Sequence, residues 1–226
     1  MRIIDKQVQS HPAYKEFYDA SYYYSYTASV RSGDAFPAVC YAHDIFDCID
    51  QEYTLKQQFD IVQSRAKRHP KSVLEIGSGR GEVSVFFYQL GCRVFSIDCN
   101  PAAQEFQTHT AQNIFRCDLD DRYVLGMGSL LELLDSIPDD IDTVVMVESL
   151  EHIFAYEWHI AWERLLPLLK KNNGRLIVNN VLFPLGYPYD RIPEHVMPVD
   201  DKLFDDLASQ SRQILHRHLG NICLDF

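Results

Sequence analysis

The sequence lacks any long apolar run. No uninterrupted stretch approaches the roughly 20 residues that a membrane-spanning helix needs, and the N-terminus has no apolar core of the kind that a secretory leader carries. The six cysteines among the 226 residues form no C-x-x-C pair. Reduced, buried thiols are therefore the expected state, because redox motifs and metal sites need closely spaced cysteines. These absences predict a cytoplasmic protein without a membrane segment.

Basic residues are also scarce. The chain has 21 Lys and Arg against 32 Asp and Glu, which gives a formal net charge of −11. Such a surface repels a phosphate backbone, and no long basic stripe offsets it. We therefore expect a small-molecule substrate rather than nucleic acid. The length and the 46% hydrophobic content suit one substantial α/β domain with an N-terminal extension.

One organised stretch stands out, Ser72–Asn100. Two apolar runs at 73–76 and 93–97 have the composition of buried strands, and the residues between them have helical spacing. Three glycines at alternate positions separate the first run from the helix: Gly77, Gly79 and Gly81. The pattern predicts one β-loop-α-β unit of an open parallel sheet, with the glycine turn at the edge where such sheets bind nucleotides.

Two carboxylates flank this unit. Glu75 precedes the glycines, and Asp98 ends the second run, where it is placed to accept hydrogen bonds from ribose hydroxyls. A dinucleotide motif, G-x-G-x-x-G, would need a glycine where Glu82 stands, and its pyrophosphate would be repelled by Glu75. The spacing therefore disfavours an NAD-dependent oxidoreductase and suits a cofactor that carries a positive amino group.

The run E-x-G-x-G-x-G from Glu75 to Gly81, followed by Asp98, resembles motif I of the class I S-adenosylmethionine-dependent methyltransferases. The resemblance covers about Ser72 to Phe226. It implies an α/β, Rossmann-like fold with a seven-stranded sheet of order 3-2-1-4-5-7-6, the last strand antiparallel, and helices on both faces. Residues 72–226 would form the cofactor-binding domain, and residues 1–71 an N-terminal helical extension that covers the cofactor or substrate.

The same resemblance implies S-adenosyl-L-methionine as cofactor. The glycines would admit it, Glu75 would face its amino acid end, and Asp98 would take its ribose hydroxyls. Residues 113–116 have the composition of the third strand, and an acidic residue after that strand commonly meets the adenine amino group, which implicates Asp118. The implied contact set is Glu75, Gly77, Gly79, Gly81, Asp98, Cys99, Asp118 and Glu148.

A second constellation, Glu148-Ser-Leu-Glu-His152, follows the apolar run 141–147, which predicts a fourth strand. It falls at the carboxyl end of that strand, where chemistry is expected in this architecture. A histidine with an ordinary pKa near ~6.5 suits a general base at neutral pH. The predicted catalytic residues are His152, with Glu148 beside it, and His195 from the loop after the fifth strand.

Other interpretations of E-x-x-E-H stay open. The pattern also resembles that of the small-RNA 2′-O-methyltransferases, which use E-x-x-E-H and a later histidine to hold a divalent metal. This resemblance implies that Mg²⁺ or Mn²⁺ would be bound by Glu148, Glu151, His152 and His195. Glu151 and His152 could instead only cap a helix. A non-catalytic scaffold that uses the tyrosine-rich segment 14–26 as an interaction surface is the third alternative.

The remaining patterns predict further elements. A helix is expected over 53–68, and Asn100-Pro101 should begin another. Apolar spacing then predicts helices at 130–134, 156–171 and 200–209, a fifth strand at 175–179, and a hairpin of 213–219 with 222–226 that turns at Gly220-Asn221. That hairpin would supply the antiparallel last strand.

Overall fold

A computed structural model describes residues 1–6, 69–147, 149–179, 196–218 and 221–226. One mixed sheet of eight strands runs through this part of the chain in the order β1-β4-β3-β2-β5-β6-β8-β7. Its strands are β1 (Arg2–Asp5), β2 (Ser72–Ile76), β3 (Arg93–Asp98), β4 (Tyr123–Met127), β5 (Thr143–Val147), β6 (Arg175–Asn179), β7 (Gln213–His218) and β8 (Asn221–Asp225). The first six strands are parallel, and β8 is antiparallel to both of its neighbours.

The sheet differs from the seven-stranded sheet expected from the sequence. The additional strand is β1, which pairs with β4 at the edge and begins the segment that was expected to be a helical extension. Strand pairing at an edge uses backbone groups that every sequence has. A four-residue strand that is mostly exposed therefore shows no alternation of apolar and polar residues by which it could be recognised. With β1 set aside, the strands from β2 onward stand in the order third, second, first, fourth, fifth, seventh, sixth.

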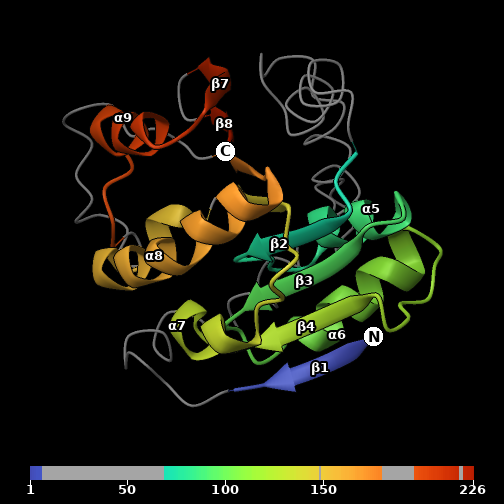
Figure 1. The fold of residues 1–226 in the computed structure, drawn as a ribbon. Coiled ribbons are helices and arrows are strands. Elements are labelled where there is room, and N and C mark those ends of the chain that lie inside the picture. Colours follow the sequence, from blue (N-terminus) through green and yellow to red (C-terminus); the bar gives the residue numbers. More distant parts are fainter. Residues whose placement is uncertain (7–68, 148, 180–195, 219–220) are drawn as a thin grey trace.

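Helices cover both faces of the sheet (Figure 1). They are α5 (Glu82–Gln89), α6 (Ala103–His109), α7 (Leu130–Leu133), α8 (Ala155–Asn172) and α9 (Asp201–Ser209), with a π-turn η1 (Thr110–Ile114) and 3-10 turns η2 (Leu134–Ser136) and η3 (Leu150–His152). On one face α7, α8 and α9 pack against the sheet, and on the other α5 and α6 do. Alternate residues of each parallel strand enter opposite cores, as in Val73 and Leu74 of β2.

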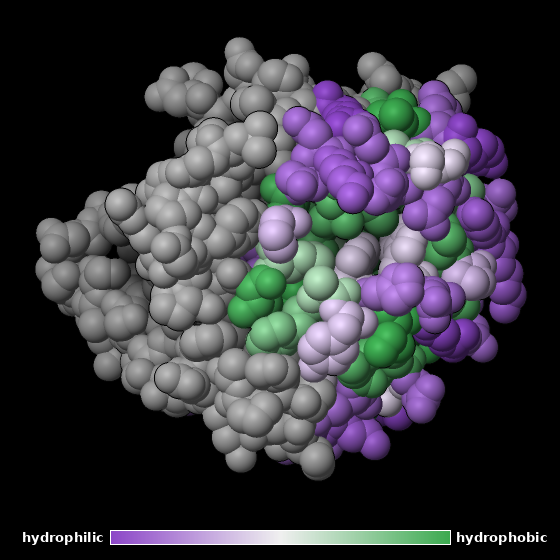
Figure 2. Space-filling view, turned by 90° about the vertical axis from the view of Figure 1, so that its left-hand side faces the viewer, coloured by the Kyte–Doolittle hydropathy of each residue, from purple (hydrophilic) through white to green (hydrophobic). Residues whose placement is uncertain are grey.

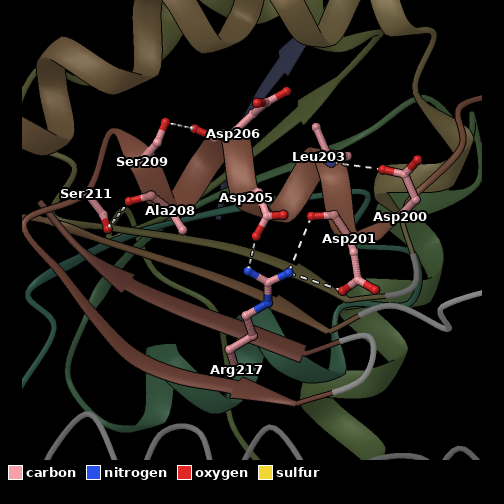
Figure 3. Close-up of polar contacts among 9 residues, drawn as sticks. All are labelled: Asp200, Asp201, Leu203, Asp205, Asp206, Ala208, Ser209, Ser211 and Arg217. Carbon is pink, nitrogen blue, oxygen red and sulfur yellow. Dashed lines mark hydrogen bonds and ion pairs between the residues drawn. The ribbon is translucent and has the colours of Figure 1, made fainter.

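Most predicted elements after residue 72 are confirmed to within a few residues. Local chemistry explains their ends. Ser129 and Glu132 form a capping box at α7, and the Asp200 side chain accepts a hydrogen bond from Leu203 N at 2.8 Å to begin α9. Arg217 of β7 bridges Asp201 and Asp205 of α9 (Figure 3), although such exposed pairs stabilise a fold by only about 1 kcal/mol or less.

The sequence predicted the third strand of the domain at residues 113–116, and this prediction is wrong. Residues 110–114 continue helix α6 as the π-turn η1, and Phe115 N donates to Thr110 O at 3.2 Å. The strand itself is β4, ten residues later. The short run Asn-Ile-Phe-Arg resembles a strand locally, but tertiary packing of the helix overrides that propensity.

Several expectations cannot be compared with the structure. The helix expected over 53–68 and the tyrosine-rich segment 14–26 lie outside the described residues. In the described part, no helix combines the length and hydropathy needed to cross a membrane. The four described cysteines, Cys92, Cys99, Cys117 and Cys223, are free thiols.

Helix α8 offers a test of this packing. Leu165 is fully buried in the core beneath α8, whereas Ile160 on the same helix is 44% exposed. We expect Leu165→Ala to lower the free energy of unfolding by about 2–5 kcal/mol through lost burial and a cavity. Ile160→Ala, the matched control, should change it by less than about 0.5 kcal/mol. Urea unfolding of both variants measures this, and equal effects would contradict the assigned face.

Candidate active site

The candidate site lies at the carboxyl edge of the parallel strands, on the left of the view in Figure 1. The glycine turn follows β2, Asp98 ends β3, and the turn η3 follows β5. Figure 2 views the molecule from that side. Apolar and weakly polar residues gather in the middle of the described surface, and hydrophilic residues lie around them. This edge brings together motifs that are more than 50 residues apart in sequence.

The glycine turn needs glycine for reasons inside the protein. Gly77 has φ +72°, and a Cβ there would lie 2.4 Å from the Cβ of Ser149. Gly81 has φ +80°, and its Cβ would lie 2.7 Å from Cγ of Gln107. Both conformations strain other residues, and both approaches exclude a side chain. The turn is thus held tightly between η3 and α6.

Asp98 joins the turn to the next strand. Its Oδ2 accepts a hydrogen bond from Gly79 N at 2.6 Å, and its Oδ1 accepts one from Asn100 N at 2.8 Å. The side chain is almost fully buried. Each carboxylate oxygen has further lone-pair capacity, so the group can accept from a ligand while it holds both backbone amides. Asp98 therefore lies where the sequence predicts it, against the glycine turn.

Glu75 lies beneath the turn rather than on its surface. It is only 3% exposed, and Ser84 Oγ of α5 donates a hydrogen bond to its Oε2. Burial raises the pKa of Glu75 to about 8, and the bond from Ser84 acts in the opposite direction. The carboxyl group is therefore mostly protonated at neutral pH.

Arg80 and Glu82 form a buried ion pair, with Nη2 of Arg80 2.8 Å from Oε1 of Glu82. Burial raises the pKa of Glu82, and the guanidinium of Arg80 opposes this. Glu82 is also the first residue of α5. The first helical position thus carries an acidic side chain, where the dinucleotide motif has a glycine and its helix N-terminus faces a pyrophosphate.

The turn η3, with Ser149 just before it, connects the glycine turn to the chain after β6. Ser149 Oγ donates to Ile76 O at 2.8 Å, and the carbonyl of Glu151 accepts from Val196 N at 2.9 Å and Met197 N at 3.1 Å. His152 is partly exposed, with its Nε2 3.9 Å from Oε1 of the buried Glu151. Glu148 and His195, predicted as its catalytic neighbours, lie outside the described residues.

Asp118 lies before the amino end of β4, whereas the sequence prediction placed it after the carboxyl end of a strand. It precedes β4, is exposed, and its backbone carbonyl accepts from the hydroxyl of Tyr88 at 3.1 Å, near the end of α5. The prediction depended on a strand ending at Arg116, and that strand does not exist. Gly128 occupies the carboxyl end of β4 instead, and its N–H donates to Asp98 O at 2.9 Å.

Cys99 follows Asp98 at the carboxyl edge and is half-buried. Burial raises the pKa of its thiol well above the ordinary value, so it is not a thiolate at neutral pH. In the described ranges, no three His, Cys, Asp or Glu side chains are arranged to hold a metal ion. Two members of the possible metal set, Glu148 and His195, are not in those ranges.

Sequence reasoning missed Gln107, which contacts the glycine turn from α6. The available signal was its spacing. Ala103, Gln107 and Ala111 recur every four residues and are all buried, so a polar residue stands within an otherwise apolar helical stripe. Such a position needs buried hydrogen-bond partners.

Comparison with known proteins agrees with this geometry. A family model described as a methyltransferase domain matches residues 41–210. Among solved structures, the chain is similar to a putative caffeoyl-CoA O-methyltransferase from Staphylococcus aureus, with a TM-score of 0.59 and 15% identity over 90% of this chain and 97% of that one. For TehB from Haemophilus influenzae the TM-score is 0.50 at 16% identity, over 82% and 64% of the two chains. No curated protein matches the sequence.

The family model covers most of the chain, so the chain belongs to this family of methyltransferase domains. Its fold and glycine turn are those of the class I, Rossmann-like methyltransferases that use S-adenosylmethionine.

Glu75 gives the site a measurable pH dependence. In the unfolded chain its carboxyl ionises near 4.5, whereas the folded chain keeps the proton up to about pH 8. The native state therefore binds more protons between these values, so this group's contribution to stability is lost as pH rises from 4.5 to 8. Glu75→Gln removes this titration. Its free energy of unfolding relative to wild type should rise between pH 5 and pH 8, by an amount on the order of a few kcal/mol.

Urea unfolding at both pH values measures that difference. Glu105→Gln, the same change at an exposed position on α6, is the control and should show no comparable trend. A flat or opposite trend for Glu75→Gln would show that the buried carboxyl is ionised in the native state.

Proposed function

We propose that this protein transfers the methyl group of S-adenosyl-L-methionine to an oxygen, nitrogen or carbon atom of a small molecule. The observation that carries the proposal is the junction of Asp98 with the glycine turn at the carboxyl edge, 2.6 Å from Gly79 N. In an open α/β sheet this edge is the place where a nucleoside ligand binds.

The groups at this edge suit the cofactor. Asp98 places a carboxylate, the acceptor that ribose hydroxyls need, against the glycine turn, and that turn exposes backbone in place of side chains. The cation of the turn, Arg80, is paired with Glu82, so the turn presents no free positive charge to a phosphate. A nucleoside joined to its amino acid by a cationic sulfonium fits this arrangement better than a pyrophosphate does.

On the acceptor side, His152 is the residue we expect to act as general base. Because a methyl group on sulfonium is already activated, the protein has to align the acceptor for in-line displacement and remove its proton where it has one. S-adenosyl-L-methionine, when bound, would supply the methyl group and leave as S-adenosylhomocysteine with the C–S electron pair, and His152 would take the proton of an acceptor that carries one. Glu151, 3.9 Å from Nε2, would stabilise the resulting imidazolium.

The chain after β6 also contacts the turn η3. Val196, the residue after His195, donates its N–H to the carbonyl of Glu151. This contact holds Val196 against the turn that carries His152. The net charge of −11 supports a small acceptor over nucleic acid.

Binding of S-adenosylhomocysteine, followed by calorimetry, tests the cofactor position. We expect one site per chain and a loss of at least about tenfold in affinity for Asp98→Ala, which corresponds to about 1.4 kcal/mol. Asp121→Asn, an exposed acidic position before β4, is the control and should bind like wild type. Failure of the wild-type chain to bind would reject the proposed function.

The second candidate function is a metal-dependent RNA 2′-O-methyltransferase. Titrations with Mg²⁺, with Mn²⁺ and with a chelator distinguish it from the proposed small-molecule methyltransferase. If the small-RNA type of site is present, metal should bind through Glu148, Glu151, His152 and His195, and acceptor methylation should need it. Equal methylation with chelator and with metal would exclude that candidate.

His152→Ala tests the base. Turnover with an acceptor found by screening should fall by roughly 10²–10⁴-fold, the usual contribution of general acid–base catalysis, while affinity for S-adenosylhomocysteine stays unchanged. His159→Ala on α8, which is 76% exposed, is the control. Equal loss of turnover and cofactor affinity would mean that His152 supports the fold of the site rather than the proton transfer.

A further inference from the structure

A buried cluster of neutral polar groups lies directly beneath the glycine turn. It consists of Ser78 from the turn, Ser96 from β3, Gln107 from α6 and Tyr123 from β4, all at most 5% exposed. Ser96 Oγ is 2.7 Å from Ser78 Oγ and 3.1 Å from Gln107 Oε1. Three separate elements therefore meet the turn through one connected set of hydrogen bonds.

Gln107 is the centre of this cluster. Its Nε2 donates to Ser78 Oγ at 2.9 Å and to Gly79 O at 3.2 Å, and its Oε1 accepts from the Tyr123 hydroxyl at 2.8 Å. A carbonyl only accepts, so the nitrogen of the carboxamide has to face Gly79 O. The oxygen then faces Tyr123, whose hydroxyl donates to it. The orientation of the side chain is fixed by its partners.

We infer that Gln107 is a positioning residue for the cofactor, and that its carboxamide holds the Gly79 backbone in the orientation that the cofactor needs. The inference rests on the proposed position of the cofactor at the glycine turn. The two peptide groups that flank the Gly79 Cα are each held: the N–H of Gly79 by Asp98 at 2.6 Å, and its C=O by Gln107. Without the carboxamide, only the Asp98 side remains.

The residue type follows from the contacts. Glutamate has the same shape, but its carboxylate has no N–H for Ser78 or Gly79 and would place a second acid near the buried Glu75. Leucine would leave Gly79 O and the Tyr123 hydroxyl without this partner, and a buried polar group that loses its partner destabilises the fold. The Cγ of Gln107 also fills the space where a Cβ on Gly81 would lie. An amide of this length supplies donors and an acceptor here without having to bind a proton.

Gln107→Glu tests the inference, with Gln104→Glu as the matched control. Gln104 makes the same chemical change available on the same helix, at an exposed position. Calorimetric titration with S-adenosylhomocysteine should show affinity reduced at least about tenfold for Gln107→Glu and unchanged for Gln104→Glu.

A spectroscopic measurement separates positioning from general loss of stability. In chains labelled with ¹⁵N at glycine, the Gly79 amide resonance should move in Gln107→Glu, while resonances of glycines away from the turn, such as Gly91, stay in place. Loss of affinity with an unmoved Gly79 resonance would overturn the inference.

Tyr123→Phe covers the case in which Gln107→Glu does not fold. It removes only the hydroxyl that faces Oε1, so the carboxamide oxygen loses one of its two donors and keeps Ser96 Oγ. We expect a smaller loss of affinity, with the same movement of the Gly79 resonance. If wild type binds S-adenosylhomocysteine and both variants bind equally well, the inference fails and the proposed function stands. If wild type does not bind, the proposed function itself fails.

Discussion

The hydrogen bond between Gly79 N and Asp98 Oδ2, 2.6 Å long, is the contact on which the site depends. It exists because β2 and β3 pair in parallel with Ile76 opposite Ile97, so the turn after one strand meets the last residue of the other. Gly77 N and Ser78 N both donate to Ile97 O at 2.9 Å, which fixes the start of the turn on the same strand end. The first β-loop-α-β unit thus holds its glycine turn and its acidic residue in one fixed arrangement.

The turn η3, which carries the proposed base His152, is connected to this piece through steric contact. Ser149 occupies the space where a Cβ on Gly77 would lie, and its hydroxyl is bonded to Ile76 O at 2.8 Å. The turn η3 therefore cannot move toward β2 without displacing the glycine turn. Through the carbonyl of Glu151, η3 also holds Val196 and Met197, which follow β6. For an in-line displacement, in which misplacement by about 1 Å costs much of the rate, such a rigid connection between cofactor and acceptor sides is an advantage.

The sequence predicted the parts that have strong local patterns. Apolar runs bounded by Gly, Asn or Asp placed β2, β3, β5 and β6, and the apolar periodicity of 156–171 placed α8. Two parts were not predictable in this way. The edge strand β1 is stabilised by backbone pairing with β4, for which its side chains give no pattern. Residues 113–116 have strand composition, but the first two of them end the helical segment and the other two follow it without forming a strand. The error in that strand led directly to the error at Asp118, because the assignment of a site residue depends on which end of a strand it follows. Gln107 shows the same limit, since its partners come from β3, β4 and the turn.

A polar layer beneath a ligand-binding turn has a physical reason. The glycine turn leaves backbone carbonyls and a serine hydroxyl facing inward, where an apolar core would leave them unpaired at a cost of about 1–3 kcal/mol each. Charged partners would satisfy them only with a large desolvation penalty. The groups present are instead neutral: two serines, an amide, a phenol whose pKa is raised by burial, and Glu75, whose carboxyl keeps its proton up to about pH 8. Negative charge at the turn is therefore concentrated on the edge, at Asp98, where a nucleoside's hydroxyl groups can use it, and the layer beneath provides geometry without competing for the ligand.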